Sequence, residues 1–170
     1  MTGATQVVYV IACSAPPVLD LPRFLGLLHE HGWDPYVILT PTAATWVDVD
    51  QLAAISGHAV RVEPRRSDDP DPLPPAEAVI VAPLTFNSLN KWAAGISDTL
   101  ALGLLNETLG LGLPITAALC IKEALRGHPV YARSVVTLST AGVAVLASER
   151  VIASVPDSPP TFDWSRVLPR

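Results

Sequence analysis

Short apolar runs recur along the chain and alternate with longer stretches in which apolar residues return at helical spacing. The short runs are rich in β-branched residues, which is typical of strands covered on both faces of a parallel sheet. They predict strands at residues 7–12, 36–39, 59–62, 78–82, 115–119 and 143–146. Strands that alternate with helices predict a layered α/β domain with a mostly parallel sheet of about six strands.

The stretches between these runs predict the helices. The first helix follows Asp20, a possible N-cap that precedes Pro22, and ends near Gly32. Further helices are predicted at residues 43–55, 89–105 and 131–141. Residues 63–75 combine charges with prolines and predict an exposed loop. We therefore expect one domain at residues 1–154 and a proline-rich C-terminal tail at residues 155–170.

Composition adds an expectation about association. The 170 residues suffice for one domain of ordinary size. Only 16% of them are charged and 49% are hydrophobic, whereas a typical soluble domain is about 25% charged. Part of the surface is then expected to be apolar and shared in a homo-oligomer. The net charge is −5, and no basic run exceeds Arg65-Arg66, so nucleic acid and anionic membranes are not expected partners.

The cysteines and the N-terminus bear on the compartment. Cys13 and Cys120 lie far apart without a Cys-x-x-Cys spacing, which favours reduced thiols over a disulfide framework or a zinc site. The chain begins without the basic start of a signal peptide. It contains no unbroken apolar stretch of about 20 residues, the length that a membrane span needs. A cytoplasmic location is expected.

Loops at the carboxyl ends of the predicted strands are the candidate binding elements, because ligands of parallel α/β sheets bind at that edge. These loops span residues 13–16, 40–44, 83–88 and 119–123. Their short hydroxyl and amide side chains, which suit phosphate and polar ring edges, are Ser14, Thr40, Thr42, Thr85, Asn87 and Ser88. The alternative is plain helix capping by Thr42, Ser88 and Asp20.

Several motifs of common enzyme classes are absent from the sequence. It contains no Gly-x-Gly-x-x-Gly, P-loop, Gly-x-Ser-x-Gly or His-Glu-x-x-His pattern. Its four histidines, His29, His31, His58 and His128, are scattered. The first two fall near a predicted helix end, where complementarity to the helix dipole is the simpler interpretation.

One stretch resembles a known family. Pro-Leu-Thr-Phe-Asn-Ser at residues 83–88 is followed by Lys91, Ala94-Gly95-Ile96, Asp98 and Leu100. This resembles the Pro-Ala-Ser-Ala-Asn-Thr motif and the Lys-x-Ala-x-Gly-x-x-Asp-x-Leu helix of the flavoproteins that include phosphopantothenoylcysteine decarboxylase and peptidyl-cysteine decarboxylases. Weaker similarity at residues 13–15, at 40–46 and after His128 extends the resemblance over residues 6–147.

The resemblance implies a flavodoxin-like domain with three layers, α/β/α, that binds FMN. It also implies trimers or multiples of trimers, with the flavin near a subunit boundary. Asn87, which matches the Asn of the motif, is the strongest single candidate because its amide both donates and accepts. The residues that the resemblance assigns to the cofactor are Cys13, Ser14, Ala15, Thr40, Thr42, Thr85, Phe86, Asn87, Ser88 and Leu119.

The catalytic elements of these decarboxylases match less well. The family's His falls within residues 68–70, which contain none, and Ile121 stands where its substrate-binding Asn is expected. The tail lacks the family's flap Cys. These departures imply a divergent flavin-dependent lyase or oxidoreductase that acts on another substrate.

Two alternatives remain open at this point. One is a non-catalytic regulatory or partner subunit, and the other is a flavin prenyltransferase-like protein, whose basic phosphate-binding residues have no evident counterpart. Cys120 and Lys122 occupy the altered substrate motif. A thiol or an amine there could react beside a flavin, but Cys120 also fits an inert small hydrophobe and Lys122 a solvated helix start.

Overall fold

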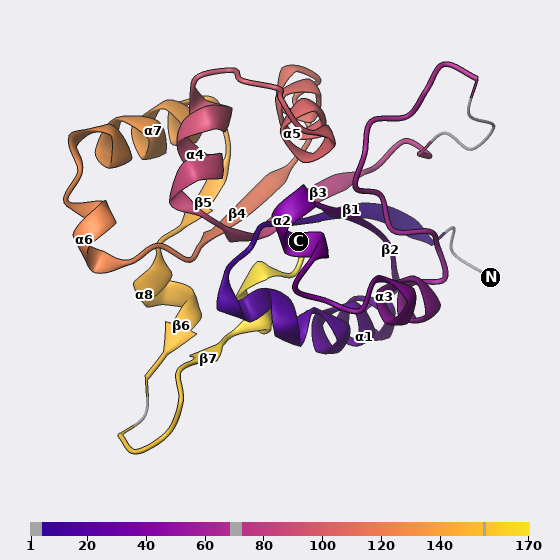
Figure 1. The fold of residues 1–170 in the computed structure, drawn as a ribbon, viewed down its shortest axis with the longest axis horizontal. Helices are drawn as coiled ribbons and strands as arrows, with labels where there is room; N and C mark the ends of the chain where they lie inside the picture. Colours follow the sequence, from indigo (N-terminus) through magenta and orange to yellow (C-terminus); the bar gives the residue numbers. More distant parts are fainter. Residues whose placement is uncertain (1–4, 69–72, 155) are drawn as a thin grey trace.

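A five-stranded parallel sheet forms the centre of the computed structural model, which describes residues 5–68, 73–154 and 156–170 (Figure 1). Its strands lie in the order β2-β1-β3-β4-β5, the order of flavodoxin-like sheets. Every neighbouring pair is parallel. The strands are β1 (Gln6–Ala12), β2 (Trp33–Leu39), β3 (Ala78–Leu84), β4 (Ile115–Leu119) and β5 (Ala144–Leu146).

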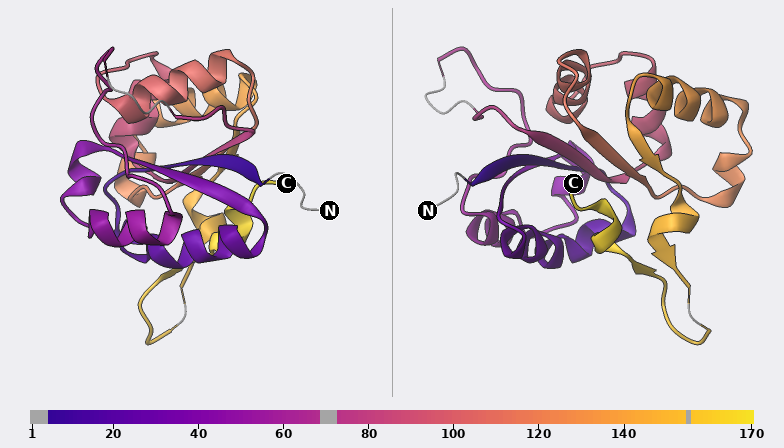
Figure 2. Two further views of the ribbon diagram at one scale, coloured as in Figure 1. Left: turned by 90° about the vertical axis from the view of Figure 1, so that its right-hand side faces the viewer. Right: turned by 180° about the vertical axis from the view of Figure 1, so that it is seen from behind.

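Helices cover both faces of this sheet (Figure 2). On one face, α1 (Leu21–Glu30) and α3 (Val49–Ser56) pack against the strands. On the other face lie α4 (Phe86–Ala93), α5 (Leu100–Gly110) and α7 (Pro129–Thr140). Alternate residues of β1 point to opposite faces, so that Val8 and Val10 join the first core cluster and Tyr9 and Ile11 the second. The predicted three-layer α/β architecture is confirmed.

Shorter elements connect these layers. Several of them lie next to the carboxyl ends of the strands, and a two-stranded antiparallel hairpin follows the sheet near the C-terminus (Figure 1). The short elements are η1 (Pro16–Asp20), α2 (Pro41–Ala44), α6 (Glu123–Arg126), α8 (Ser148–Val151), β6 (Ile152–Ala153), β7 (Thr161–Phe162) and η2 (Trp164–Val167). No helix among the described residues combines the length and the apolar character that a bilayer crossing requires.

The predicted strand at residues 59–62 is reduced to one parallel bridge between Ile38 and Arg61. The Arg61 amide donates to the Val37 carbonyl and the Arg61 carbonyl accepts from the Leu39 amide, each at 2.9 Å. This segment lies at the sheet edge, and none of its residues is fully buried. The loop predicted to follow it contains no helix or strand in its described part, and residues 69–72 lie outside the described residues.

Two predicted helices are each divided in the structure. The Asp48 side chain accepts from the Gln51 amide at 3.0 Å and starts α3 after the short α2. In the second case, α4 ends before Gly95, which has a φ of 74°. The Thr99 side chain then accepts from the Leu102 amide at 3.2 Å and starts α5. Helical spacing of apolar residues continued across both breaks, whereas the capping residues within them determined where the helices end.

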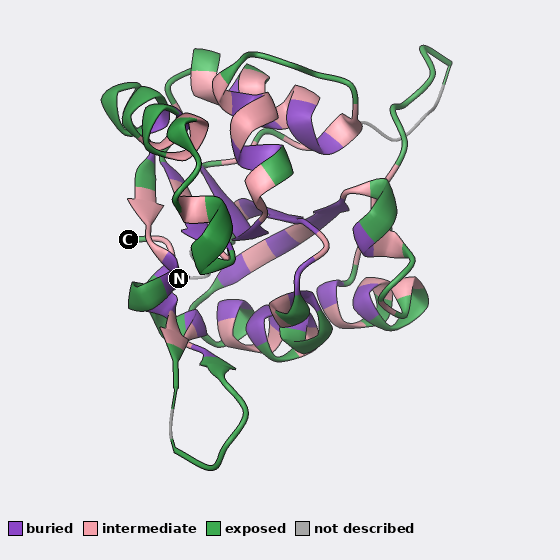
Figure 3. Cartoon of the chain, turned by 60° about the vertical axis from the view of Figure 1, so that its left-hand side comes forward, coloured by how far each residue is buried: buried purple, intermediate pink, exposed green. Residues whose placement is uncertain are grey.

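The residues predicted to form a C-terminal tail pack against the domain. The β7 strand pairs with β6, and η2 follows it. Phe162, Trp164 and Val167 are buried in the same core cluster as residues of α1, and residues 156–160 of the hairpin are exposed (Figure 3). The proline-rich composition predicted a tail and gave no sign of these buried contacts.

Candidate functional site

Backbone hydrogen bonds hold four loops side by side at the carboxyl edge of the sheet. Each of these bonds runs from the first residue after a strand to one of the last two residues of the neighbouring strand. They run from the Cys13 amide to Pro83 O (3.0 Å), from the Thr40 amide to Ala12 O (3.1 Å) and from the Cys120 amide to Leu84 O (3.0 Å). The loops that follow β1, β2, β3 and β4 therefore meet at one place, as expected for a parallel sheet.

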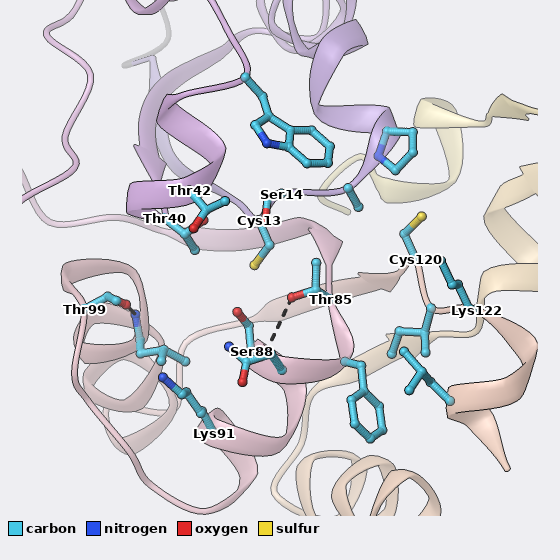
Figure 4. Close-up of a pocket in the computed structure, with 18 of the residues that line it drawn as sticks. Cys13, Ser14, Thr40, Thr42, Thr85, Ser88, Lys91, Thr99, Cys120 and Lys122 are labelled. Carbon is cyan, nitrogen blue, oxygen red and sulfur yellow. Dashed lines mark hydrogen bonds between the residues drawn. The ribbon is translucent and has the colours of Figure 1, made fainter. Parts of the chain in front are cut away.

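A cavity of about 990 Å³ opens between these loops (Figure 4). Nine of the ten residues predicted to bind a cofactor line it: Cys13, Ser14, Ala15, Thr40, Thr42, Thr85, Phe86, Asn87 and Ser88. The tenth, Leu119, is fully buried within the sheet and is not among the lining residues. Because Leu119 is the last residue of β4, its side chain belongs to the core, and the lining begins at Cys120.

Eleven further residues line the cavity. They include two cations, several apolar side chains and residues from segments that the sequence did not link to a site: Pro16, Pro41, Trp46, Lys91, Thr99, Leu102, Cys120, Ile121, Lys122, Leu125 and Ile152. Lys91 could have been found, because it lies four residues after Asn87 on one helix face. Ile152 could not, because it reaches the site from the C-terminal hairpin, which had no sequence signature.

Two threonines cap helices at this edge. Thr40 Oγ1 accepts from the Ala43 amide at 3.2 Å, and Thr85 Oγ1 accepts from the Ser88 amide at 3.5 Å. Capping at these loops is therefore real, but the caps are not the predicted Thr42 and Ser88. Each capping hydroxyl keeps its own O–H for another acceptor, so capping and ligand binding are compatible here.

Asn87 is exposed at the start of α4, and its side chain has no hydrogen-bond partner among the described residues. Its amide therefore offers a donor and an acceptor to a ligand in the cavity. Asp20, the third predicted cap, precedes α1 without a capping bond and instead accepts from Trp164 Nε1 at 2.9 Å.

The two lysines that line the cavity differ in their ion-pair partners. Lys91 Nζ donates to Asp98 Oδ2 at 2.5 Å, whereas the exposed Lys122 has no ion-pair partner within the described part of the chain.

Burial raises the pKa of the Cys13 thiol, and hydrogen bonds with Ser88 and Thr85 offset this only in part. Burial also raises the pKa of the Cys120 thiol. Both thiols are thus protonated near neutral pH.

None of the four histidines lines the cavity, although the His128 ring lies edge-on to the lining residue Phe86 at 5.8 Å between centroids. The His31 ring lies 2.8 Å from the Leu27 carbonyl at the end of α1, and the His29 ring lies 3.0 Å from the Ile55 carbonyl. His58 contacts Asp34 at 2.6 Å, and His128 caps α7 by accepting from the Val130 amide. Across residues 5–68, 73–154 and 156–170, no group of three or more His, Cys, Asp or Glu could hold a metal ion.

This combination of fold and edge chemistry agrees with the sequence comparison. The sequence matches the model of the Flavoprotein family over residues 3–161. The chain belongs to the Flavoprotein family. No curated protein matches the sequence, so the family assignment rests on this match and on the resemblance of residues 83–100.

Several solved structures share this fold at low sequence identity. The FMN-dependent cysteine decarboxylase SpaF has a TM-score of 0.70 at 20% identity, over 84% of this chain and 83% of that chain. The cypemycin decarboxylase CypD has a TM-score of 0.68 at 22% identity, over 86% and 82%. AnUbiX (PadA1), solved in complex with FMN and dimethylallyl pyrophosphate, has a TM-score of 0.68 at 16% identity, over 84% and 77%.

The two thiols of the flavoprotein domain should differ in reactivity. We expect iodoacetamide to alkylate Cys120 before Cys13 at neutral pH, because Cys13 is 2% exposed and Cys120 is half-buried. Both should react more slowly than free cysteine, because the raised pKa values leave less thiolate. Peptide mapping by mass spectrometry over time measures both rates, and the Cys120→Ser variant should lose the faster phase. Alkylation of Cys13 before Cys120 would contradict the burial of the Cys13 thiol.

Proposed function

We propose that this member of the Flavoprotein family binds FMN in the cavity at the carboxyl edge of its sheet. The observation that carries the proposal is the convergence of nine predicted cofactor residues, from three separate loops, on one cavity. The cavity volume of about 990 Å³ lies at the upper end of the range of roughly 300–1,000 Å³ for ligand and cofactor sites. SpaF is FMN-dependent and AnUbiX was solved in complex with FMN, which supports the same ligand here.

The lining residues suit the different parts of a flavin. The start of α4 offers Thr85, Ser88 and backbone amides, and Ser14 adds a hydroxyl. Hydroxyls and amides at a helix N-terminus favour a phosphate group. The Asn87 amide suits the ribityl chain or the polar ring edge. Leu102 and Phe86 provide apolar surface for a ring system. A bound flavin supplies hydride and electron transfer, which these side chains cannot perform.

Removal of the Asn87 amide should weaken FMN binding. We expect Asn87→Ala to raise the FMN dissociation constant roughly tenfold, because a hydrogen bond to a ligand contributes about 1 kcal/mol and an unsatisfied partner costs more. Fluorescence titration of the apoprotein with FMN measures this constant. Asn106→Ala is the matched control, because Asn106 contacts the Ile96 carbonyl and Ser97 instead of the cavity, and its FMN affinity should stay unchanged.

Thermal unfolding provides an independent check of the same proposal. FMN at about one hundred times its dissociation constant should stabilise the wild-type domain by about 2.7 kcal/mol. The proposal would be wrong if FMN neither raised the thermal stability of the wild-type protein nor quenched its fluorescence. Equal losses of affinity in the Asn87 and Asn106 variants would instead remove Asn87 from the site.

We further propose that the chain is a divergent flavoenzyme and does not decarboxylate cysteine. Ile121, which stands where the family's substrate-binding Asn is expected, is 6% exposed and lines the cavity. An apolar side chain leaves a substrate carboxylate without its hydrogen-bond partner, which costs affinity and discrimination. Of the residues aligned with the family's His, Asp69 and Pro70 lie outside the described residues.

Two other functions remain as alternatives. A non-catalytic regulatory or partner subunit would keep the fold and the flavin but show no turnover. A flavin prenyltransferase-like activity is supported by the structural similarity to AnUbiX. A pyrophosphate substrate would need cations, and the lysines that line the cavity are Lys91 and Lys122. Because Lys91 already pairs with Asp98, this activity has less support.

Association with further copies of the chain is also part of the proposal. Trp46 and Leu125 line the cavity yet are 45% and 39% exposed, and Leu111 and Val136 are 70% and 64% exposed. Large exposed apolar side chains are typical of surfaces that another chain covers. We propose a homo-oligomer, a trimer or a multiple of one, in which a neighbouring copy covers the apolar rim of the cavity.

Peptides ending in cysteine test the proposed divergence. We expect the FMN-loaded protein to release no more carbon dioxide from such a peptide than free FMN does, because Ile121 cannot hydrogen-bond the carboxylate. Carbon dioxide release and flavin absorbance, followed together, measure turnover. Release that Asn87→Ala abolishes would overturn the divergence and identify an ordinary cysteine decarboxylase.

A further inference from the structure

The C-terminal segment contacts two elements that contribute residues to the cavity, the β4–α6 loop and η1. Its described residues, 148–154 and 156–167, run from α8 through the β6–β7 hairpin to η2 (Figure 1). Most of this segment falls in the stretch predicted to be a tail.

On the β4–α6 side, the segment holds the cavity wall directly. The Ile121 amide donates to Ser148 Oγ at 3.2 Å, and both residues are buried. Glu149 forms an ion pair with Arg126 at the end of α6. Ile152 itself lines the cavity. The position of this wall therefore depends on where α8 and β6 lie.

The middle of the segment is tied together by backbone bonds. The Asp163 amide donates to the Val151 carbonyl at 2.7 Å, and Val151 is fully buried. The β6 strand pairs with β7 through Ile152 and Phe162 and through Ala153 and Thr161. A ladder of two residue pairs is marginal without further support, so the hairpin needs an anchor elsewhere.

Trp164 supplies that anchor through its contacts with α1 and η1. Its ring stacks on Phe24 of α1 at 4.6 Å between centroids and contacts Phe162 at 4.4 Å. Its indole N–H donates to Asp20 Oδ2 at 2.9 Å, and the residue is 3% exposed. Asp20 ends η1, and Pro16 at the other end of η1 lines the cavity.

We propose that residues 148–154 and 156–167 form a brace that fixes the β4–α6 wall of the cavity relative to η1, with Trp164 as its positioning residue. The brace couples Trp164 to the Ile121 amide, although the two are 43 positions apart in the sequence and do not touch. This inference goes beyond flavin binding. It concerns the apoprotein and holds whichever ligand the cavity takes.

Hydrogen exchange at the Ile121 amide tests the brace. This amide exchanges when its bond to Ser148 opens, and local opening reports the stability of that region. We expect Trp164→Phe, which keeps a ring but loses the N–H donor, to speed exchange of the Ile121 amide in the apoprotein roughly fivefold. Exchange of the Leu39 amide, which donates to the Arg61 carbonyl, should remain unchanged. Residue-resolved NMR exchange measures both.

Two further variants complete the experiment. Ser148→Ala removes the acceptor itself and should speed Ile121 exchange at least as much. Trp92→Phe is the matched control, because Trp92 is also buried, shares its core cluster with Ile121 and has no hydrogen-bond partner for its indole N–H among the described residues. This variant therefore tests whether altered core packing alone speeds the exchange. Trp92→Phe should leave the exchange rate of the Ile121 amide unchanged.

The outcomes decide the proposal. Faster exchange at Ile121 in Trp164→Phe, with Leu39 unchanged and with no such effect in Trp92→Phe, supports the brace. Unchanged Ile121 exchange in Trp164→Phe overturns it. Equal acceleration of Ile121 and Leu39, or equal effects of the two tryptophan variants, also overturns it, since either shows only a general loss of stability. None of these readouts requires FMN, so failure of flavin binding would be recognised separately.

Discussion

The parallel register of the sheet determines where the candidate chemistry of this chain can lie. Because β1, β2, β3 and β4 all run in the same direction, their following loops emerge at one edge. Backbone bonds such as that from the Thr40 amide to the Ala12 carbonyl extend the ladder beyond the strands and fix the loops against one another. Side chains separated by more than 70 positions, such as Ser14 and Asn87, thus line one cavity. The buried apolar strands stabilise this arrangement, so the side chains of the site do not have to contribute to the stability of the fold.

The cavity combines two chemical environments as a consequence. The hydroxyl and amide groups follow β1, β2 and β3, together with some apolar side chains such as Trp46 and Phe86. The loop after β4 adds the Cys120 thiol, apolar side chains and Lys122. The first environment suits the polar parts of a flavin, and the second leaves room for a substrate or for a neighbouring copy of the chain. The brace acts on the second environment, since its pocket-side contact is the Ile121 amide. The polar end is fixed by the sheet itself, and the apolar end depends on the C-terminal segment.

Much of this organisation could be predicted from the sequence, because buried parallel strands leave a simple apolar signature. Five of the six predicted strands are present. The missing one, predicted at residues 59–62, is an edge segment that forms a single bridge through Arg61. The predicted loops lead to nine lining residues. Leu119 does not line the cavity, because its side chain is buried in the core of the sheet.

Contacts between distant segments were beyond the reach of sequence patterns. Helical periodicity continued through Asp48 and Thr99, although their side chains restart helices there. The role of Trp164 rests on its contacts with Phe24 and Asp20, which are tertiary contacts within a segment whose prolines suggested a loose tail. Such contacts leave no periodic signal along the chain, so only the folded arrangement discloses them.

The central claim is that this chain holds FMN at the carboxyl edge of its sheet. The most direct measurement is the absorbance spectrum of freshly purified protein, together with the mass of any cofactor released on denaturation. We expect a yellow protein with a flavin spectrum and a released cofactor with the mass of FMN. A colourless protein that releases no cofactor and takes up none from added FMN would contradict it, as would the release of FAD.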